Sequence, residues 1–120
     1  SVAADDERVT QRGQTGADVV SVAPDGSGHG VNLRQSFTHL AERGITRLLA
    51  EAGGALASAL LRDGLIDELV VFRAPALIGG DGIPMTGPLG VDTLDQKVAL
   101  HRTALRAVGD DVVETFRLQN

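Results

Sequence analysis

The chain has 120 residues, of which 42% are hydrophobic and 22% charged, a balance typical of a folded domain rather than of a disordered segment. It contains no cysteine, which excludes disulfides, zinc–thiolate sites and thiol nucleophiles. Its formal net charge is −5 and its only aromatic residues are three phenylalanines, so the sequence argues against nucleic-acid binding.

The first third of the chain predicts a strand and a helix after a loose beginning. Residues 1–16 are rich in charge and lack apolar periodicity, so we expect a loose segment there. The β-branched run at residues 18–23 predicts a buried strand, which ends at the turn-forming residues Pro24-Asp25-Gly26. Apolar residues at helical spacing predict a helix over residues 32–43, with Asn32 as its N-cap.

The central part predicts a second strand and a second helix. Residues 45–50 form a short apolar run typical of a strand, and the helix that follows begins after Gly53-Gly54 and ends at Asp63-Gly64. Strand, helix, strand and helix in this order are the pattern of a parallel α/β layer.

The last part predicts a further strand, a long loop and a hairpin. Residues 65–74 predict the strand, and the Gly- and Pro-rich residues 75–90 a long loop of the kind that often carries function. Residues 93–107 and 111–118 predict two strands joined by a turn at Gly109-Asp110, so we expect the end of the sheet to be antiparallel.

The chain contains no apolar run near the ~20 residues that a membrane-spanning helix needs. Its first residues are polar and do not resemble a signal peptide. We therefore expect a cytoplasmic protein without a membrane partner.

One glycine-rich stretch, Gly26-Ser27-Gly28-His29-Gly30, lies between the first strand and the first helix, where a dinucleotide-binding fingerprint is expected. The third glycine of that fingerprint is replaced by Val31, whose side chain would block the close approach of helix and strand. The pattern favours a plain mobile turn, and a phosphate contact is the alternative.

A second candidate site lies where the strand at 45–50 meets the next helix. Glu51 follows the strand, and Gly53 and Gly54 open a helix of small residues. The free amides of a first helical turn, together with the positive end of the helix dipole, favour a bound phosphate, and glycines let it approach the backbone. The alternative is a tight strand-to-helix turn in which Glu51 is solvated or caps the helix.

Other patterns predict no catalytic residue and no metal site. Ser58 lies inside a predicted helix without flanking glycines, and the three histidines lack metal-ligand spacing. Asp67 and Glu68 are adjacent in a predicted strand, so their side chains point to opposite faces and cannot share acid–base work.

The run from Leu40 to Gly82 closely resembles the C-terminal reductase domain of the riboflavin-biosynthesis deaminase/reductase family. The shared motifs are the turn Glu51-Ala52-Gly53 before a leucine-rich helix, the strand start at Gly64 to Glu68, and Leu77-Ile78-Gly79-Gly80 beyond Ala74-Pro75. The resemblance implies an α/β, dihydrofolate reductase-like fold with a mixed sheet flanked by helices. Residues 1–120 would form a single domain that corresponds to its C-terminal part and ends in an antiparallel hairpin. Such a part would leave a sheet edge and some of its core exposed.

The same resemblance implies an activity and its site. The family reduces 5-amino-6-(5-phosphoribosylamino)uracil to its ribityl form with NADPH, and the resemblance also implies a homodimer. Glu51 would contact this small-molecule substrate near the reacting centre. The NADPH phosphates would lie along the backbone of a continuous run of residues, namely Gly53, Gly54, Ala55, Leu56, Ala57, Ser58 and Ala59.

Two other functions stay open at this point. One is a different reductase of the same fold, acting on another pyrimidine or on a pterin, because the glycine turn reports the cofactor better than the substrate. The other is a non-catalytic oligomerisation remnant. The choice of NADPH over NADH also stays open, since spacing alone assigns no arginine to the ribose 2′-phosphate.

Overall fold

The computed structural model describes residues 2–27 and 30–119. The chain divides into two compact units, Ser1–Gly44 and Ile45–Asn120. The first unit holds two helices, α1 (Val2–Gln14) and α2 (Leu33–Glu42). The second holds one α-helix, two short 3-10 helices and a sheet of three strands among its described residues.

The beginning of the chain is the first point at which the structure corrects the sequence-based expectation. Residues 1–16 are predicted to be loose, whereas Val2–Gln14 form α1. Arg12 lies in the last turn of this helix, where a positive charge complements the helix dipole. The helix ends where Gly16 adopts a φ of 82°. A polar helix of this kind has no apolar stripe by which periodicity could find it.

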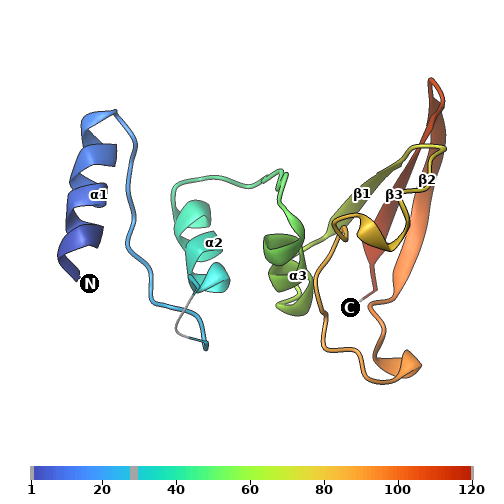
Figure 1. The fold of residues 1–120 in the computed structure, drawn as a ribbon. Coiled ribbons are helices and arrows are strands. Elements are labelled where there is room, and N and C mark those ends of the chain that lie inside the picture. Colours follow the sequence, from blue (N-terminus) through green and yellow to red (C-terminus); the bar gives the residue numbers. More distant parts are fainter. Residues whose placement is uncertain (1, 28–29, 120) are drawn as a thin grey trace. The chain divides into compact units, whose positions relative to one another are not determined.

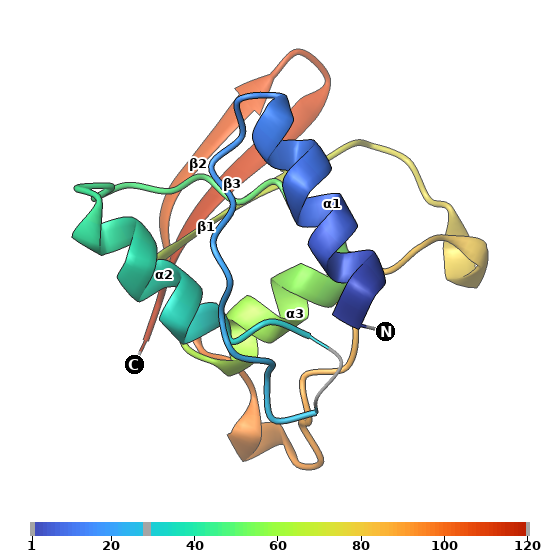
Figure 2. The ribbon, with the colours of Figure 1, turned by 90° about the vertical axis from the view of Figure 1, so that its left-hand side faces the viewer.

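The buried strand predicted at residues 18–23 is also wrong. Figure 2 shows this segment without a strand arrow. Val19 within it is 37% exposed. The segment is attached to α2 by polar contacts instead. The amide of Ala23 donates to Gln35 Oε1 at 2.8 Å, and the amide of Asn32 donates to the carbonyl of Ala23 at 2.9 Å.

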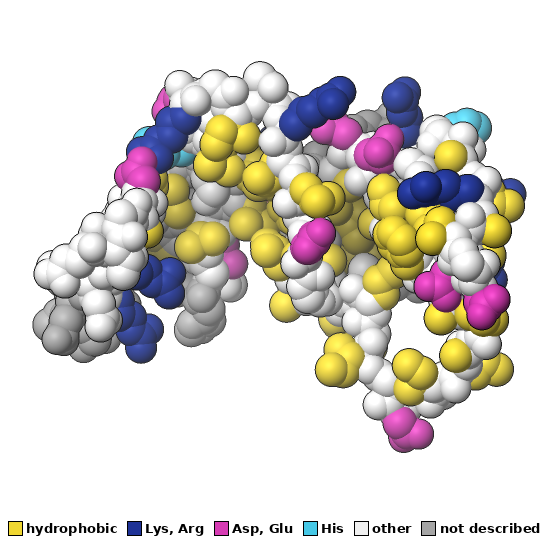
Figure 3. All heavy atoms as spheres, turned by 90° about the horizontal axis from the view of Figure 1, so that it is seen from above, with side chains coloured by type: hydrophobic (Ala, Val, Ile, Leu, Met, Phe, Trp, Pro, Cys, Tyr) yellow, Lys and Arg dark blue, Asp and Glu magenta, His cyan; other side chains and the backbone are white. Residues whose placement is uncertain are grey.

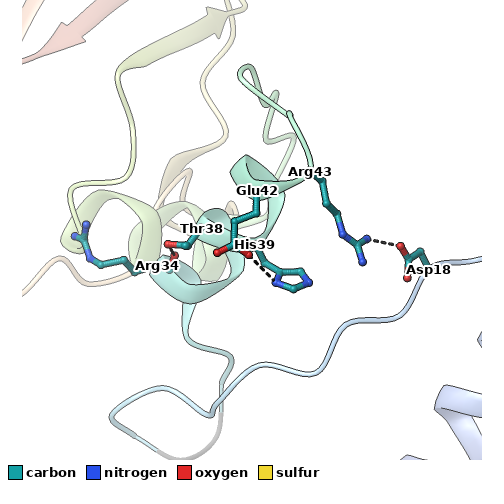
Figure 4. A network of polar contacts seen from close by, with 6 residues as sticks. All are labelled: Asp18, Arg34, Thr38, His39, Glu42 and Arg43. Carbon is teal, nitrogen blue, oxygen red and sulfur yellow. Dashed lines mark hydrogen bonds and ion pairs between the residues drawn. The ribbon is translucent and has the colours of Figure 1, made fainter.

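The helix predicted at residues 32–43 is confirmed as α2. The Asn32 side chain accepts a hydrogen bond from the amide of Gln35 at 2.9 Å, which is the predicted N-cap. Figure 4 shows the ion pair at the other end of the helix, where the Arg43 guanidinium points toward the Asp18 carboxylate. These contacts link α2 to the extended segment that precedes it.

The second unit contains α3 (Gly54–Arg62) and the strands β1 (Glu68–Arg73), β2 (Leu100–Val108) and β3 (Asp111–Leu118). Figure 1 shows the sheet in the order β1, β3, β2. Both pairings are antiparallel, and the predicted final hairpin is confirmed, with Gly109 in its turn at a φ of 61°. The 3-10 helices are Gly79–Asp81 and Leu94–Gln96.

Three boundaries in this unit differ from the prediction. Residues 45–50 form no strand and are all exposed, so the parallel pairing expected from them is absent among the described residues. A β-pattern becomes a strand only where a neighbouring strand supplies hydrogen bonds. The strand predicted at 65–74 is shortened to β1, and the one predicted at 93–107 begins only at Leu100, after a 3-10 turn.

The core of the second unit is small. Its buried apolar residues are Leu60 and Leu61 of α3 and Val113 of β3. Large apolar side chains lie on the surface instead, as Figure 3 shows in yellow; Phe72 is 65% exposed and Ile83 96%. This agrees with the expectation that the chain leaves part of its apolar surface uncovered. None of the described helices is long and apolar enough to cross a lipid bilayer.

Candidate functional site

The N-terminal end of α3 is open, as a phosphate-binding helix end requires. Gly53 is the N-cap residue with extended backbone angles (φ −69°, ψ 166°) and offers no side chain to cap the helix. The amide of Ala57 donates to the carbonyl of Gly53 at 3.1 Å, so the helix hydrogen bonds begin there. The preceding amides, those of Gly54, Ala55 and Leu56, find no backbone or side-chain acceptor among residues 2–27 and 30–119.

The two glycines at this helix end have different surroundings. A Cβ atom at Gly53 would meet no heavy atom within 4 Å, so the position of a side chain there is open. A Cβ atom at Gly54 would lie 3.0 Å from the carbonyl oxygen of Pro84 and 3.4 Å from that of Met85. Gly53 therefore leaves room for a ligand, whereas Gly54 leaves room for the chain itself.

The predicted phosphate-binding run, Gly53 to Ala59, divides into two parts in the structure. Its first residues carry the open amides of the helix end. Ser58 is 2% exposed, and its Oγ donates to the carbonyl of Gly54 at 2.7 Å, so its hydroxyl holds the first turn of the helix. Only residues 54–56 can offer free backbone amides to an anion, and a ligand role for the whole run stays a prediction.

Glu51 lies two residues before Gly53 and is exposed. No described residue forms a hydrogen bond or an ion pair with its carboxylate. Its position fits a carboxylate that is free to contact a ligand at the same helix end. Contact between Glu51 and a substrate stays a prediction.

The long loop at residues 75–90 reaches α3 at two places that the sequence analysis did not find. The amide of Gly87 donates to the carbonyl of Gly54 at 3.3 Å, at the start of the helix. The Arg62 guanidinium donates to the carbonyl of Pro88 at 2.7 Å, at the end of the helix. Sequence spacing could not indicate these contacts, because their partners are 33 and 26 residues apart.

The contacts within the glycine-rich stretch after residue 25 support the predicted plain turn rather than a phosphate contact. The Asp25 carboxylate accepts hydrogen bonds from the Ser27 amide at 3.0 Å, the Ser27 hydroxyl at 2.6 Å and the Gly30 amide at 3.2 Å. An acidic side chain therefore already occupies the amides that an anion would need. Gly28 and His29 lie outside the described residues.

Another charged cluster lies on the sheet and is structural. Glu114 of β3 forms ion pairs with Arg102 of β2 at 2.9 Å and with Arg73 of β1 at 3.7 Å, one with each carboxylate oxygen. The carboxylate thus links the three strands through two arginines, which is a structural role. The described residues contain no group of three His, Asp or Glu side chains that could hold a metal ion.

One carboxyl group shows a shifted pKa. The hydrogen bond with the Thr93 side chain, together with one to its own backbone, lowers the pKa of the exposed Asp95. Asp95 lies in the 3-10 turn before β2 and is far along the chain from α3. The shift therefore concerns the structure of that turn.

Solved structures show where this architecture occurs. A RibD protein of Acinetobacter baumannii matches with a TM-score of 0.69 and 26% identity over 73% of this chain and 25% of that one. A pyrimidine reductase-like protein of Corynebacterium diphtheriae matches with a TM-score of 0.77 and 22% identity over 96% of this chain and 44% of that one. The second likeness shows a shared fold.

Sequence relatives point the same way. The riboflavin biosynthesis protein RibD of Escherichia coli is 36% identical over 89 residues, which are 74% of this chain and 24% of that protein. The 2,5-diamino-6-ribosylamino-4(3H)-pyrimidinone 5′-phosphate reductase of Methanothermobacter thermautotrophicus is 29% identical over 74% of this chain and 42% of that protein. This chain thus spans about a quarter of the length of RibD relatives.

The family model described as the RibD C-terminal domain matches residues 2–114. That match includes both compact units, the open end of α3 and nearly all of the sheet. The chain therefore belongs to the RibD C-terminal domain family.

Proposed function

We propose that this chain is part of an NADPH-dependent reductase of riboflavin biosynthesis with a dihydrofolate reductase-like fold. The substrate would be 5-amino-6-(5-phosphoribosylamino)uracil, whose ribose is reduced to a ribityl chain. Membership of the RibD C-terminal domain family supports the activity. The observation that carries the proposal is the open end of α3, where three amides have no acceptor among the described residues and Gly53 supplies no capping side chain.

The residues present fit a phosphate-bearing cofactor. The amides of Gly54, Ala55 and Leu56 would donate to its phosphate oxygens, and the positive end of the α3 dipole would attract their charge. When bound, NADPH supplies the hydride that is transferred to a carbon of the ribose. The chain contributes the geometry: it would hold cofactor and substrate in the orientation that hydride transfer needs, so the step no longer depends on a chance encounter of the two molecules.

Glu51 would act on the substrate side of the same helix end. Its exposed carboxylate follows the segment 45–50 and precedes the phosphate-binding turn, so it would contact the polar part of the substrate beside the nicotinamide. A carboxylate accepts hydrogen bonds from hydroxyl and amino groups, which are the groups that a ribosylamino-pyrimidine offers.

A second candidate substrate has its own support. The Methanothermobacter relative is named as a reductase of 2,5-diamino-6-ribosylamino-4(3H)-pyrimidinone 5′-phosphate. This compound shares the ribosylamino-pyrimidine and the 5′-phosphate with the first candidate. A comparison of turnover on the two compounds, in a preparation that reduces either of them, would choose between them.

The proposal includes a homodimer, which the exposed apolar surface supports. Val70 and Phe72 lie on the same face of β1 and are 46% and 65% exposed. Apolar residues gathered on a sheet of this size are typical of a surface that contacts further polypeptide. Sedimentation of the chain over a range of concentrations would show whether a second copy covers them.

The first test is calorimetric titration of the folded chain with NADPH and, separately, with NADH. We expect NADPH to bind, and Gly53→Val to weaken its binding at least ~10-fold because the new side chain fills the phosphate space. The backbone angles of Gly53 suit any residue, so this variant keeps the fold. Gly53→Ala is the matched control, because it changes the cap equally but adds only one methyl group.

A folded chain that binds no NADPH would contradict the proposal for this chain. Equal NADPH affinity of the wild-type protein and Gly53→Val would move the cofactor away from the end of α3. The chain has no Trp and no Tyr, so its concentration must come from amino-acid analysis.

Glu51→Gln tests the substrate role separately. The amide keeps the size of the side chain and removes its charge, so we expect turnover to fall ~10-fold or more while the affinity for NADPH stays the same. Steady-state kinetics and NADPH titration of the same preparation measure both quantities. A parallel loss of NADPH affinity would place Glu51 in the cofactor site instead.

A further inference from the structure

The loop segment Pro84–Pro88 contacts residues from both the first and the last turn of α3. At the start of the helix, the amide of Gly87 donates to the carbonyl of Gly54, and the carbonyl of Pro84 lies where a Gly54 side chain would be. From the last turn of the helix, the Arg62 guanidinium donates to the carbonyl of Pro88 at 2.7 Å. Because Pro88 directly follows Gly87, the segment stays near the first turn and the long Arg62 side chain reaches back to it along the helix.

The large apolar side chains at the start of this segment are exposed and do little to hold it in place. Ile83, just before it, is 96% exposed and Met85 within it is 61% exposed. The described contacts that attach it are polar ones to α3, and the bond from Arg62 is the shorter and the charged one. Loss of the Arg62 contact would leave the weaker Gly87 bond, at 3.3 Å, to hold the segment alone.

The segment also shapes the first turn of α3. The carbonyl of Gly54 accepts from both the Gly87 amide and the Ser58 hydroxyl, so the peptide between Gly54 and Ala55 is held from two sides. That peptide carries the amide of Ala55, one of the three free amides at the helix end. A change in the position of the loop would therefore change the direction of an amide that faces the proposed phosphate.

We propose that Arg62 is a positioning residue for the cofactor site. By holding Pro88, it keeps Gly87 on the carbonyl of Gly54 and thereby orients the amides of the first turn, at the opposite end of the helix from its own Cα. This inference rests on the proposed function, since it assigns the phosphates to that turn. It adds to the proposed cofactor site a residue that acts through the loop and does not touch the cofactor.

Amide hydrogen exchange tests the structural half without any cofactor. We expect Arg62→Met to speed exchange at the Gly87 amide at least ~5-fold, because the segment loses its charged anchor. Arg62→Lys should restore slow exchange, since an ammonium group can also donate to the Pro88 carbonyl. Arg106→Met, on β2, is the matched control and should leave exchange at Gly87 unchanged. Wild-type exchange rates at Gly87 in Arg62→Met would overturn the inference.

NADPH titration tests the functional half with the same variants. We expect Arg62→Met to weaken NADPH binding ~5- to 10-fold, Arg62→Lys to recover most of the affinity and Arg106→Met to retain it. Recovery by lysine separates positioning by a charged donor from a general loss of packing. Unchanged affinity in Arg62→Met, in a protein whose wild type binds NADPH, would overturn the inference and leave the proposed function standing. A wild type that binds no NADPH would overturn both.

Discussion

The helices α2 and α3 begin in opposite ways. The start of α2 is capped by its own sequence, because the Asn32 side chain accepts a hydrogen bond from the Gln35 amide. The start of α3 has Gly53 at the same position and no side-chain cap. A glycine N-cap sacrifices a capping hydrogen bond and keeps the amides of the first turn available.

This difference separates a structural helix end from one that can bind a ligand. At α2 the Asn32 side chain takes the amide of Gln35, so this amide is not available to an anion. At α3 the Ser58 hydroxyl and the Gly87 amide both donate to the carbonyl of Gly54. The amides of residues 54–56 have no acceptor among the described residues. A helix end that binds an anion needs free backbone amides whose positions are fixed.

The largest expected effect comes from Gly54, where the loop contacts the helix. A valine side chain there would meet the carbonyls of Pro84 and Met85, so we expect Gly54→Val to lower the free energy of unfolding by about 1–3 kcal/mol and to abolish NADPH binding. Urea denaturation followed by circular dichroism measures the first quantity. Gly53→Val should change stability far less, because no heavy atom lies within 4 Å of a Cβ atom there. An equal loss of stability in both variants would contradict the different roles assigned to Gly53 and Gly54.

Exchanging the two kinds of N-cap gives an intermediate effect. Asn32→Ala should lower the stability of α2 by about 1 kcal/mol and leave NADPH affinity unchanged, because the lost hydrogen bond caps α2 and is not part of the proposed cofactor site. Gly53→Asn should stabilise α3 slightly and weaken NADPH binding, since the new side chain takes an amide that the phosphate needs. Amide hydrogen exchange measures the stability of each helix, and calorimetric titration measures the NADPH affinity of both variants. Tighter NADPH binding by Gly53→Asn would contradict the proposal that free amides at the start of α3 bind the cofactor phosphates.

The smallest expected effect concerns Asp95, remote from both helix ends. Thr93→Val should raise the pKa of Asp95 toward its ordinary value, because the hydrogen bond that favours the carboxylate is lost. A pKa lowered in the folded state stabilises the protein above the unfolded-state pKa, and this contribution disappears as the pH falls through the folded-state value. Carboxyl NMR shifts titrated with pH would show it, and an unchanged pKa in Thr93→Val would disprove the role of that hydroxyl.

The sequence predicted best the features that depend on neighbouring residues. The cap at Asn32, the helix after Gly53-Gly54 and the hairpin at Gly109 are confirmed, and each rests on a residue whose side chain or backbone freedom acts within a few positions. The strands expected at 18–23 and 45–50 are wrong for the opposite reason. Their residues suit a strand, but a strand also needs a partner from elsewhere in the chain.

For the candidate site, the sequence alone determined the open helix end, because a glycine N-cap before a helix leaves its first amides uncapped wherever the helix lies. Only the tertiary structure decided what each glycine does and which residues support the site. Gly53 faces empty space and Gly54 faces the loop, and Arg62 reaches that loop across 26 residues of sequence. Such contacts depend on how the loop returns to the helix, which no local pattern encodes.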